Sequence, residues 1–278
     1  MRLEKEVWFS YHQACAQAKK DIRKAERLGL ENCPKELKHE LETRKVANTV
    51  ELGTIEIPVD QIVGIAALEE KNLYSPDFLP AASATSPYAE QWCQLYLDYL
   101  SDEGWHEPIR CFEFLGRFYV EDGKKRVSVL KANGATVTEA IVTRIMPVMV
   151  QDEEIEKYYA FLNDYEKTGL YQVIFTQPGT FAKLQAAMGH EADYVWQNSD
   201  RFRFLFNLPP VAHALNEAFH GRLNITAADA MVALLEECSF KELRRMQPWN
   251  LTKLLQDSWV KLFKIADPDF EAAPIGAA

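Results

Sequence analysis

The sequence predicts an α+β protein in which a mixed α/β domain is flanked by helical segments at both ends. Three observations predict this fold class: an amphipathic helical period near the start, alternating strand and helix patterns in the middle, and a mostly helical pattern beyond Pro147. We therefore divide the chain into an N-terminal helical segment (1–48), an α/β domain (49–148), a mostly helical C-terminal domain (149–266) and a flexible tail (267–278).

The N-terminal segment is predicted to hold two helices. Residues 4–28 form the first, because apolar residues recur at spacings of three and four, and Gly29 is a typical stop. Pro34 is tolerated in a first helical turn, so a second short helix should run to about Arg44. The charged face of the first helix is interpreted as a solvated surface rather than as a nucleic-acid contact. Its expected buried stripe consists of Val7, Tyr11, Cys15, Ala18, Ile22 and Ala25.

The middle of the chain is predicted to alternate strands and helices. In order, we expect strands over 49–52 and 54–59, a short helix capped by Asp60 that carries Ile62 and Val63, a long loop over 64–87, a helix opened by Ser86-Pro87 and ending near Gly104, a hairpin of strands 109–114 and 117–120, a helix from Gly123 through Ala132, and a strand over 138–145. The buried face of the helix after Ser86 should carry Trp92, Leu95, Tyr96, Tyr99 and Leu100.

The C-terminal part is predicted to be a helical packing module. Helices are expected over 153–168, 181–188, 209–219, 227–238 and 251–263, with a short strand over 171–175. The aromatic-rich stretch 194–206 can be interpreted as packing between helices or as a base-stacking surface, and the first is favoured. Residues 225–235 followed by 241–246 resemble a helix-turn-helix pattern, but the nearby basic residues are too few to predict a DNA-binding surface.

Composition and charge limit the function further. The 278 residues are 47% hydrophobic and 26% charged, which excludes bulk disorder and collagen-like repeats. The net charge of −10 argues against nucleic-acid binding by the whole surface, because phosphate contacts need clustered Lys and Arg. The five cysteines are scattered without a CxxC pair, so neither a disulfide framework nor a zinc site is expected.

The charge pattern also predicts the compartment. The first six residues are mostly charged, where a signal peptide would need an apolar core. The most apolar stretch, 140–150, is interrupted by Arg144 and Pro147 and is shorter than the roughly 20 apolar residues of a membrane helix. We expect a cytoplasmic protein without a membrane partner.

The segment 118–131 carries the clearest chemical signal. A strand leads into Gly123, and a helix begins at once with Lys124, Lys125 and Arg126 in its first turn. Cations are unfavourable there, because the unpaired N–H groups and the helix dipole make this end positive. An anion held by the N–H groups and the cations explains the pattern, whereas the alternative is a surface helix neutralised by Glu121 and Asp122. From 110 to 131 there are six basic and three acidic residues, a net charge of +3.

This region resembles the ParB-like domain of the ParB/sulfiredoxin superfamily. The phosphate-binding box of that family reads Gly-Glu-Arg-Arg, and 123–126 (Gly-Lys-Lys-Arg) takes its place, with Gly134 at the position of the glycine that ends the following helix. Residues 100–109 resemble the helix end, glycine and Pro-Ile strand entry of the family, and 55–62 resemble its opening strand and turn. The resemblance covers about 54–145 and implies the ParB/sulfiredoxin fold, within a group of larger proteins with flanking helical segments.

Departures from the family pattern limit which activity the resemblance implies. Lys124 stands where DNA-partition members have a glutamate associated with CTP hydrolysis and where sulfiredoxins have a nucleophilic cysteine. The Asn-Pro…Pro-Arg segment of the partition members is not recognisable in 64–87. The nearest variant is the Asp-Gly-His-His-Arg form of the free-serine kinases. Asp122, Gly123 and Arg126 match it, but Lys124 and Lys125 replace both histidines.

The expected function is therefore binding of a nucleotide (ATP or CTP, with Mg²⁺) or another small phosphorylated ligand at Gly123, Lys124, Lys125 and Arg126, which would suit a nucleotide-dependent switch. One alternative is an ATP-dependent small-molecule kinase of the free-serine type. The resemblance then implies Asp122 as the catalytic acidic group near the metal or the acceptor hydroxyl. This alternative also needs a second acid upstream as base, for which Glu69 and Glu70 are candidates.

A second alternative is a DNA-associated regulator, which is not favoured. We expect no metal site formed by the protein alone, and we expect a homodimer.

Overall fold

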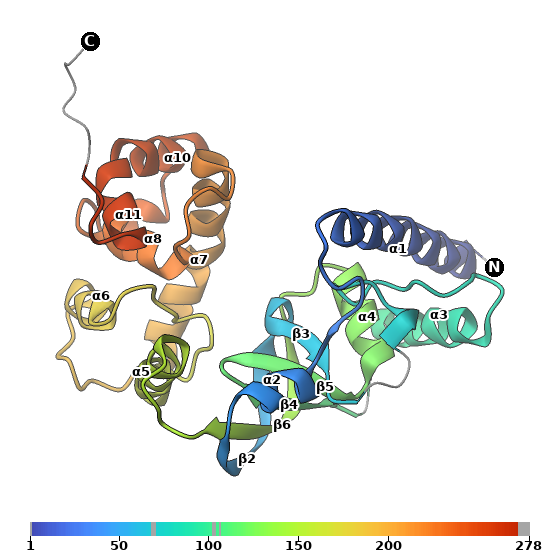
Figure 1. The fold of residues 1–278 in the computed structure, drawn as a ribbon. Coiled ribbons are helices and arrows are strands. Elements are labelled where there is room, and N and C mark those ends of the chain that lie inside the picture. Colours follow the sequence, from blue (N-terminus) through green and yellow to red (C-terminus); the bar gives the residue numbers. More distant parts are fainter. Residues whose placement is uncertain (1, 68–70, 102–103, 106, 272–278) are drawn as a thin grey trace. The chain divides into compact units, whose positions relative to one another are not determined.

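The structure is a computed structural model that describes residues 2–67, 71–101, 104–105 and 107–271. The chain forms two units, Met1–Ile155 and Glu156–Ala278, which are described separately. Unit 1 contains a mixed sheet with helices, and unit 2 is helical (Figure 1). The predicted α+β class is confirmed. Of the predicted tail, residues 272–278 lie outside the described residues.

Unit 1 is organised around a six-stranded sheet with strand order β1-β3-β5-β4-β6-β2. The strands are β1 (Lys35–Glu36), β2 (Val46–Pro58), β3 (Ile62–Ile65), β4 (Ile109–Phe114), β5 (Arg117–Asp122) and β6 (Val137–Pro147). The pairs β1–β3, β3–β5 and β4–β6 are parallel, whereas β4–β5 and β2–β6 are antiparallel. The long strand β2 lies at one edge of this sheet.

Three of the four helices described in unit 1 are stacked on one another beside the sheet (Figure 1). The four helices are α1 (Arg2–Arg27), α2 (Leu37–Thr43), α3 (Pro87–Leu100) and α4 (Lys124–Ala132), with short 3₁₀ turns η1 (Val59–Gln61) and η2 (Lys71–Leu73). Helices α1, α3 and α4 lie to one side of the sheet (Figure 1), where α1 packs on α3 and α3 on α4. The ring of Tyr11 in α1 meets that of Trp92 in α3 edge to face at 5.2 Å, and the Trp92 Nε1–H donates to Ser128 Oγ in α4 at 3.0 Å.

An ion pair is buried inside the sheet. The Glu113 carboxylate in β4 is fully buried and accepts a hydrogen bond from Arg144 Nε in β6 at 2.5 Å, and also one from the Gly116 N–H at 2.7 Å. Strands β4 and β6 are parallel neighbours, and Glu113 stands directly beside Arg144 in their register. A charge at this depth needs such a partner, because an unpaired buried ion is strongly unfavourable.

Three sequence-based expectations for unit 1 are corrected. The two strands predicted around Gly53 are one strand, β2, because a bulge at Gly53 (φ +70°) absorbs the glycine without ending the pairing with β6. Ile62 and Val63 lie in β3 and not in a helix capped by Asp60. Residues Lys35–Glu36 form β1 beside β3, so the second helix begins at Leu37 and the N-terminal segment contributes a strand to the sheet.

The elements around the later candidate site agree with the sequence. Ser86 caps α3 by accepting a hydrogen bond from the Ala89 N–H, with Pro87 in the first turn. The β4–β5 hairpin turns at Leu115-Gly116, and α4 ends at Ala132 as expected. The buried face of α3 is shifted towards its start, because Tyr88, Ala89, Trp92 and Cys93 are buried while Leu100 is exposed.

Unit 2 consists of helices that surround one apolar core. They are α5 (Glu153–Thr168, which begins just before the unit boundary), α6 (Thr180–Met188), α7 (Asn198–Phe219), α8 (Ala227–Leu235), α9 (Phe240–Leu243), α10 (Pro248–Asp257) and α11 (Trp259–Ala266). Helix α8 is buried on nearly all sides. Its buried Asp229 accepts hydrogen bonds from the N–H and hydroxyl groups of both Thr176 and Thr226.

Three expectations for unit 2 are corrected as well. Residues 171–175 do not form a strand: the Tyr171 ring packs against Phe161 of α5, Val173 lies in the apolar core of unit 2, and the Thr176 N–H donates to the Asp229 side chain. Helix α7 starts at Asn198, eleven residues before the predicted start, and continues through Pro209 and Pro210. The helix predicted over 251–263 is two helices that meet at Ser258.

Across both units, the helices within the described ranges are too short or too polar to cross a membrane.

Candidate functional site

The candidate site is built around Gly123, which joins β5 to α4. Its backbone has φ +95° and ψ 20°, a left-handed conformation that side-chain-bearing residues rarely adopt. A Cβ at this position would lie 2.7 Å from Ile109 Cγ2 and 3.0 Å from Arg126 Nε. Glycine is therefore required here for two reasons: it can adopt the left-handed backbone conformation, and it has no Cβ to clash with Ile109 and Arg126.

The first turn of α4 begins directly after this glycine. The Val127 N–H donates to the Gly123 carbonyl at 3.0 Å, which closes the first turn. The preceding N–H groups of a helix have no partner within it, and together they make its start positive. Lys124, Lys125 and Arg126 add three formal charges at this end, where cations are unfavourable by roughly 0.3–1 kcal/mol each. The arrangement suits an anion.

A pocket of about 230 Å³ opens at this turn. Its walls come from β5, from α4, from α3 and from the loop after η2. The lining residues are Tyr74, Leu95, Glu121, Asp122, Gly123, Lys124, Lys125 and Arg126. The structure thus brings all five residues predicted from the sequence, Asp122 to Arg126, to one pocket, and it adds three that the sequence analysis did not propose.

Lys125 is held over this pocket by helix α3. Its Nζ donates to Gln91 Oε1 at 2.6 Å and lies 5.6 Å from the centre of the Tyr88 ring. Both partners leave the ammonium charge uncompensated, because an amide oxygen and an aromatic face are neutral groups. Burial raises the pKa of Tyr88, so its phenol stays protonated. The Lys125 cation is therefore positioned but not neutralised by these contacts.

Arg126 has a different environment from the two lysines. Its guanidinium donates to the carbonyl of Glu107, to the carbonyl of Pro108 at 3.4 Å and to Asp122 Oδ2 at 2.8 Å. The side chain is 12% exposed, whereas that of Asp122 is 65% exposed. These contacts tie α4 to the chain segment that leads into β4. Arg126 therefore stabilises the turn at Gly123.

Two carboxylates, those of Glu121 and Asp122, line the same pocket. Mg²⁺ in nucleotide sites is usually held by one or two carboxylates together with the phosphates of the ligand. The donor set therefore fits Mg²⁺ bound jointly with a phosphorylated ligand, although Asp122 also pairs with Arg126. Glu69 and Glu70, the acids considered as a catalytic base, lie outside the described residues.

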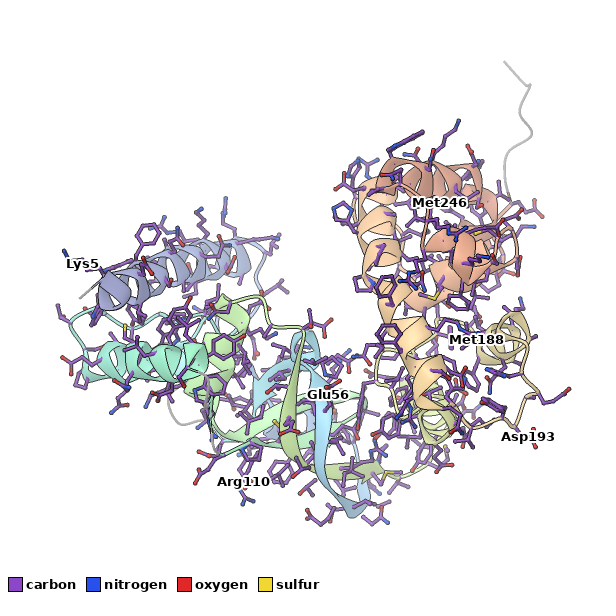
Figure 2. All side chains as sticks on the ribbon, turned by 180° about the vertical axis from the view of Figure 1, so that it is seen from behind. Lys5, Glu56, Arg110, Met188, Asp193 and Met246 are labelled. Atoms are coloured by element: carbon purple, nitrogen blue, oxygen red, sulfur yellow. The ribbon has the colours of Figure 1, made fainter. Side chains whose placement is uncertain are left out.

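The positive charge predicted for 110–131 is less concentrated than the sequence suggests. Arg117 lies at the far end of β5 from Gly123 and pairs with Glu154. Arg110, labelled in Figure 2, is exposed on β4, and Lys131 lies in the last turn of α4. Burial lowers the pKa of Lys131, while Asp77 and Asp60 oppose this shift. Beside the Arg126–Asp122 pair, the charged residues that line the pocket are therefore Lys124, Lys125 and Glu121.

Apart from Glu121 in β5, the residues that the sequence did not indicate come from outside the β5–α4 segment. Gln91 and Tyr88 contact the Lys125 ammonium group, and Trp92 donates a hydrogen bond to Ser128 of α4. Tyr74 reaches the pocket from a loop. No local motif marks these positions, because they meet α4 only through the packing of α3 and the loop against it.

Neither a family model nor a curated protein matches this sequence.

Proposed function

We propose that unit 1 binds a small phosphorylated ligand, such as the phosphate chain of a nucleotide, at the start of α4. One observation carries the proposal: a left-handed glycine turn opens a pocket at a helix N-terminus, and two lysines line it. The backbone N–H groups of the first turn would bind phosphate oxygens, with Lys124 and Lys125 supplying charge. Arg126 is assigned to hold the turn and not to bind the ligand.

The pocket volume suggests how much of the ligand it encloses. Pockets that enclose a drug-sized ligand measure roughly 300–1,000 Å³. At about 230 Å³ this pocket is smaller, so it suits a phosphate or a diphosphate group, and the remainder of a nucleotide would extend out of it. We therefore expect recognition of the phosphates to contribute more to affinity than recognition of the base. ATP, CTP and GTP should then bind with similar affinity.

The experiment is a thermal-shift titration of the whole chain with phosphate, diphosphate, ATP, CTP and GTP, each with and without Mg²⁺. Bound ligand stabilises the folded state by an amount that increases with its concentration. The double variant Lys124→Gln/Lys125→Gln should lose most of the shift. The matched control is Lys19→Gln/Lys20→Gln, which removes two exposed lysines from α1. If no phosphorylated compound shifts the transition, or if both double variants behave alike, the proposal is wrong.

Phosphoryl transfer is a second candidate because Glu121 and Asp122 line the same pocket as the two lysines. In such a kinase Asp122 would act on the metal or on the acceptor hydroxyl. Incubation with ATP, Mg²⁺ and free serine should then yield phosphoserine, which can be measured by chromatography. Asp122→Asn keeps an oxygen for Arg126 but removes the carboxylate charge, so it should abolish transfer while phosphate binding persists. Absence of phosphoserine with the unaltered protein would rule out the free-serine type.

A further inference from the structure

Unit 2 exposes two aromatic rings where buried packing was expected. Within the aromatic-rich stretch 194–206, Trp196 and Phe204 are buried, in agreement with the sequence analysis. Phe202 and Phe206, one turn apart on α7, are 66% and 46% exposed. Their ring centres are 5.9 Å apart with a tilt of 35°. Phenylalanine is among the residues most often buried, so a pair of exposed rings on one helix face requires an explanation.

One cationic side chain lies on this pair, and two others line a hollow on the same helices. The Arg244 guanidinium, just after α9, lies 4.8 Å above the centre of the Phe206 ring. Arg203, three residues before Phe206 on α7, lines a hollow of about 600 Å³ together with Lys241 of α9 and the acids Glu236 and Glu237. Met246, labelled in Figure 2, follows Arg244 by two residues. We call Phe202, Arg203, Phe206, Lys241 and Arg244 the aromatic–basic surface.

Acidic residues line the hollow of this surface, but they pair with another group. No ion pair joins Arg203, Lys241 or Arg244 to an acid among the residues described in unit 2. The acids nearest in sequence have other partners: Glu236 and Glu237 both pair with Lys261, at 2.8 and 2.9 Å. Glu242 accepts hydrogen bonds from the N–H and hydroxyl groups of Ser239, which lower its pKa. In the described part of unit 2, Arg203, Lys241 and Arg244 are therefore without an ion-pair partner, although the Glu236 and Glu237 carboxylates line the same hollow as Arg203 and Lys241.

We propose that the aromatic–basic surface binds single-stranded nucleic acid. Exposed aromatic rings offer faces on which unpaired bases stack, and neighbouring Arg and Lys side chains contact the phosphates between those bases. A duplex keeps its bases stacked on each other and therefore cannot use the rings. The charge complementarity and the ring pair together favour a single strand over a duplex and over an apolar protein partner. DNA and RNA share this chemistry.

The test is fluorescence anisotropy of the full chain with labelled single-stranded DNA, single-stranded RNA and duplex DNA of equal length. Both single strands should bind more tightly than the duplex, and the ratio between DNA and RNA shows which is preferred. Phe202→Ala and Phe206→Ala should each weaken binding by about 5- to 150-fold, the range for loss of one stacked base. Arg203→Gln and Arg244→Gln should each reduce the salt slope by about 0.7.

Controls separate binding from folding. Phe202→Tyr/Phe206→Tyr keeps both rings and should retain affinity. Phe9→Ala removes a 62% exposed ring from α1 and should leave affinity unchanged. Binding that is equal for duplex and single strands, or insensitive to both alanine variants, would overturn the proposal. It is also overturned if no strand binds at low salt, or if the alanine variants only convert a dimer to a monomer, which would make this surface an interface between two copies.

Discussion

Replacing Gly123 with alanine should destabilise unit 1 and disturb the pocket together. A left-handed backbone is unfavourable by about 1–2 kcal/mol for a residue with a Cβ. The new Cβ would also lie 2.7 Å from Ile109 Cγ2 and 3.0 Å from Arg126 Nε, closer than atoms pack. Overpacking of this kind is unfavourable by about 1–3 kcal/mol more. We therefore expect Gly123→Ala to lower the free energy of unfolding by about 2–5 kcal/mol.

Gly134→Ala is the matched control because Gly134 also has a positive φ, +66°, but no atom within 4 Å of the added Cβ. It should lower the free energy of unfolding by only about 1–2 kcal/mol. Urea unfolding followed by circular dichroism measures both variants, and the thermal shift with diphosphate reports on the pocket. The steric argument fails if Gly123→Ala is no more destabilising than Gly134→Ala. It also fails if the Gly123 variant binds diphosphate as well as the unaltered chain.

Three further predictions concern buried or half-buried polar groups. Trp92→Phe leaves the buried Ser128 hydroxyl without its donor, and urea unfolding should show a loss of about 1–3 kcal/mol; an unchanged midpoint contradicts this. Glu113→Gln removes the charge that pairs with Arg144 and should lower the unfolding free energy by about 3–5 kcal/mol. A smaller loss of unfolding free energy than for Trp92→Phe would show that the ion pair is solvated. Burial raises the pKa of Asp164 to about 6, so the folded protein binds more protons than the unfolded chain between about pH 4 and 6. Stability should therefore fall as the pH rises through this window. Thermal unfolding of Asp164→Asn should not show this decrease. If the unfolding temperature of the variant depends on pH as that of the unaltered chain does, Asp164 is not the group responsible.

Local sequence signals were sufficient to predict the secondary structure of the segment that forms the candidate site. Ser86-Pro87 marks the start of α3 because a side-chain cap and a first-turn proline act within a few residues. Gly123 marks the junction of β5 and α4 for the same reason, since its backbone conformation is a local property. The five residues predicted for the pocket are consecutive in the chain. Their proximity therefore required no knowledge of the tertiary structure.

Elements that depend on distant partners were not predictable in the same way. Strand β3 is short and largely buried, so it lacks the alternation of a half-exposed strand, and Asp60 before it resembles a helix cap. Helix α7 passes two prolines because Phe204 and Val211, on either side of them, are both buried in the same core. The exposure of Phe206 is likewise a tertiary property, because the sequence alone does not distinguish a buried ring from an exposed one.

The edge strand β2 has a consequence for how the chain behaves at high concentration. An exposed strand of 13 residues offers a row of backbone groups on which another chain can add a strand and begin an aggregate. The register of β2 with β6 shifts twice, once between Val46 and Asn48 and once between Glu51 and Gly53. Such bulges twist the outer edge, so that a flat incoming strand cannot match its hydrogen-bonding groups over the full length. Gly53 thereby helps to keep individual molecules apart.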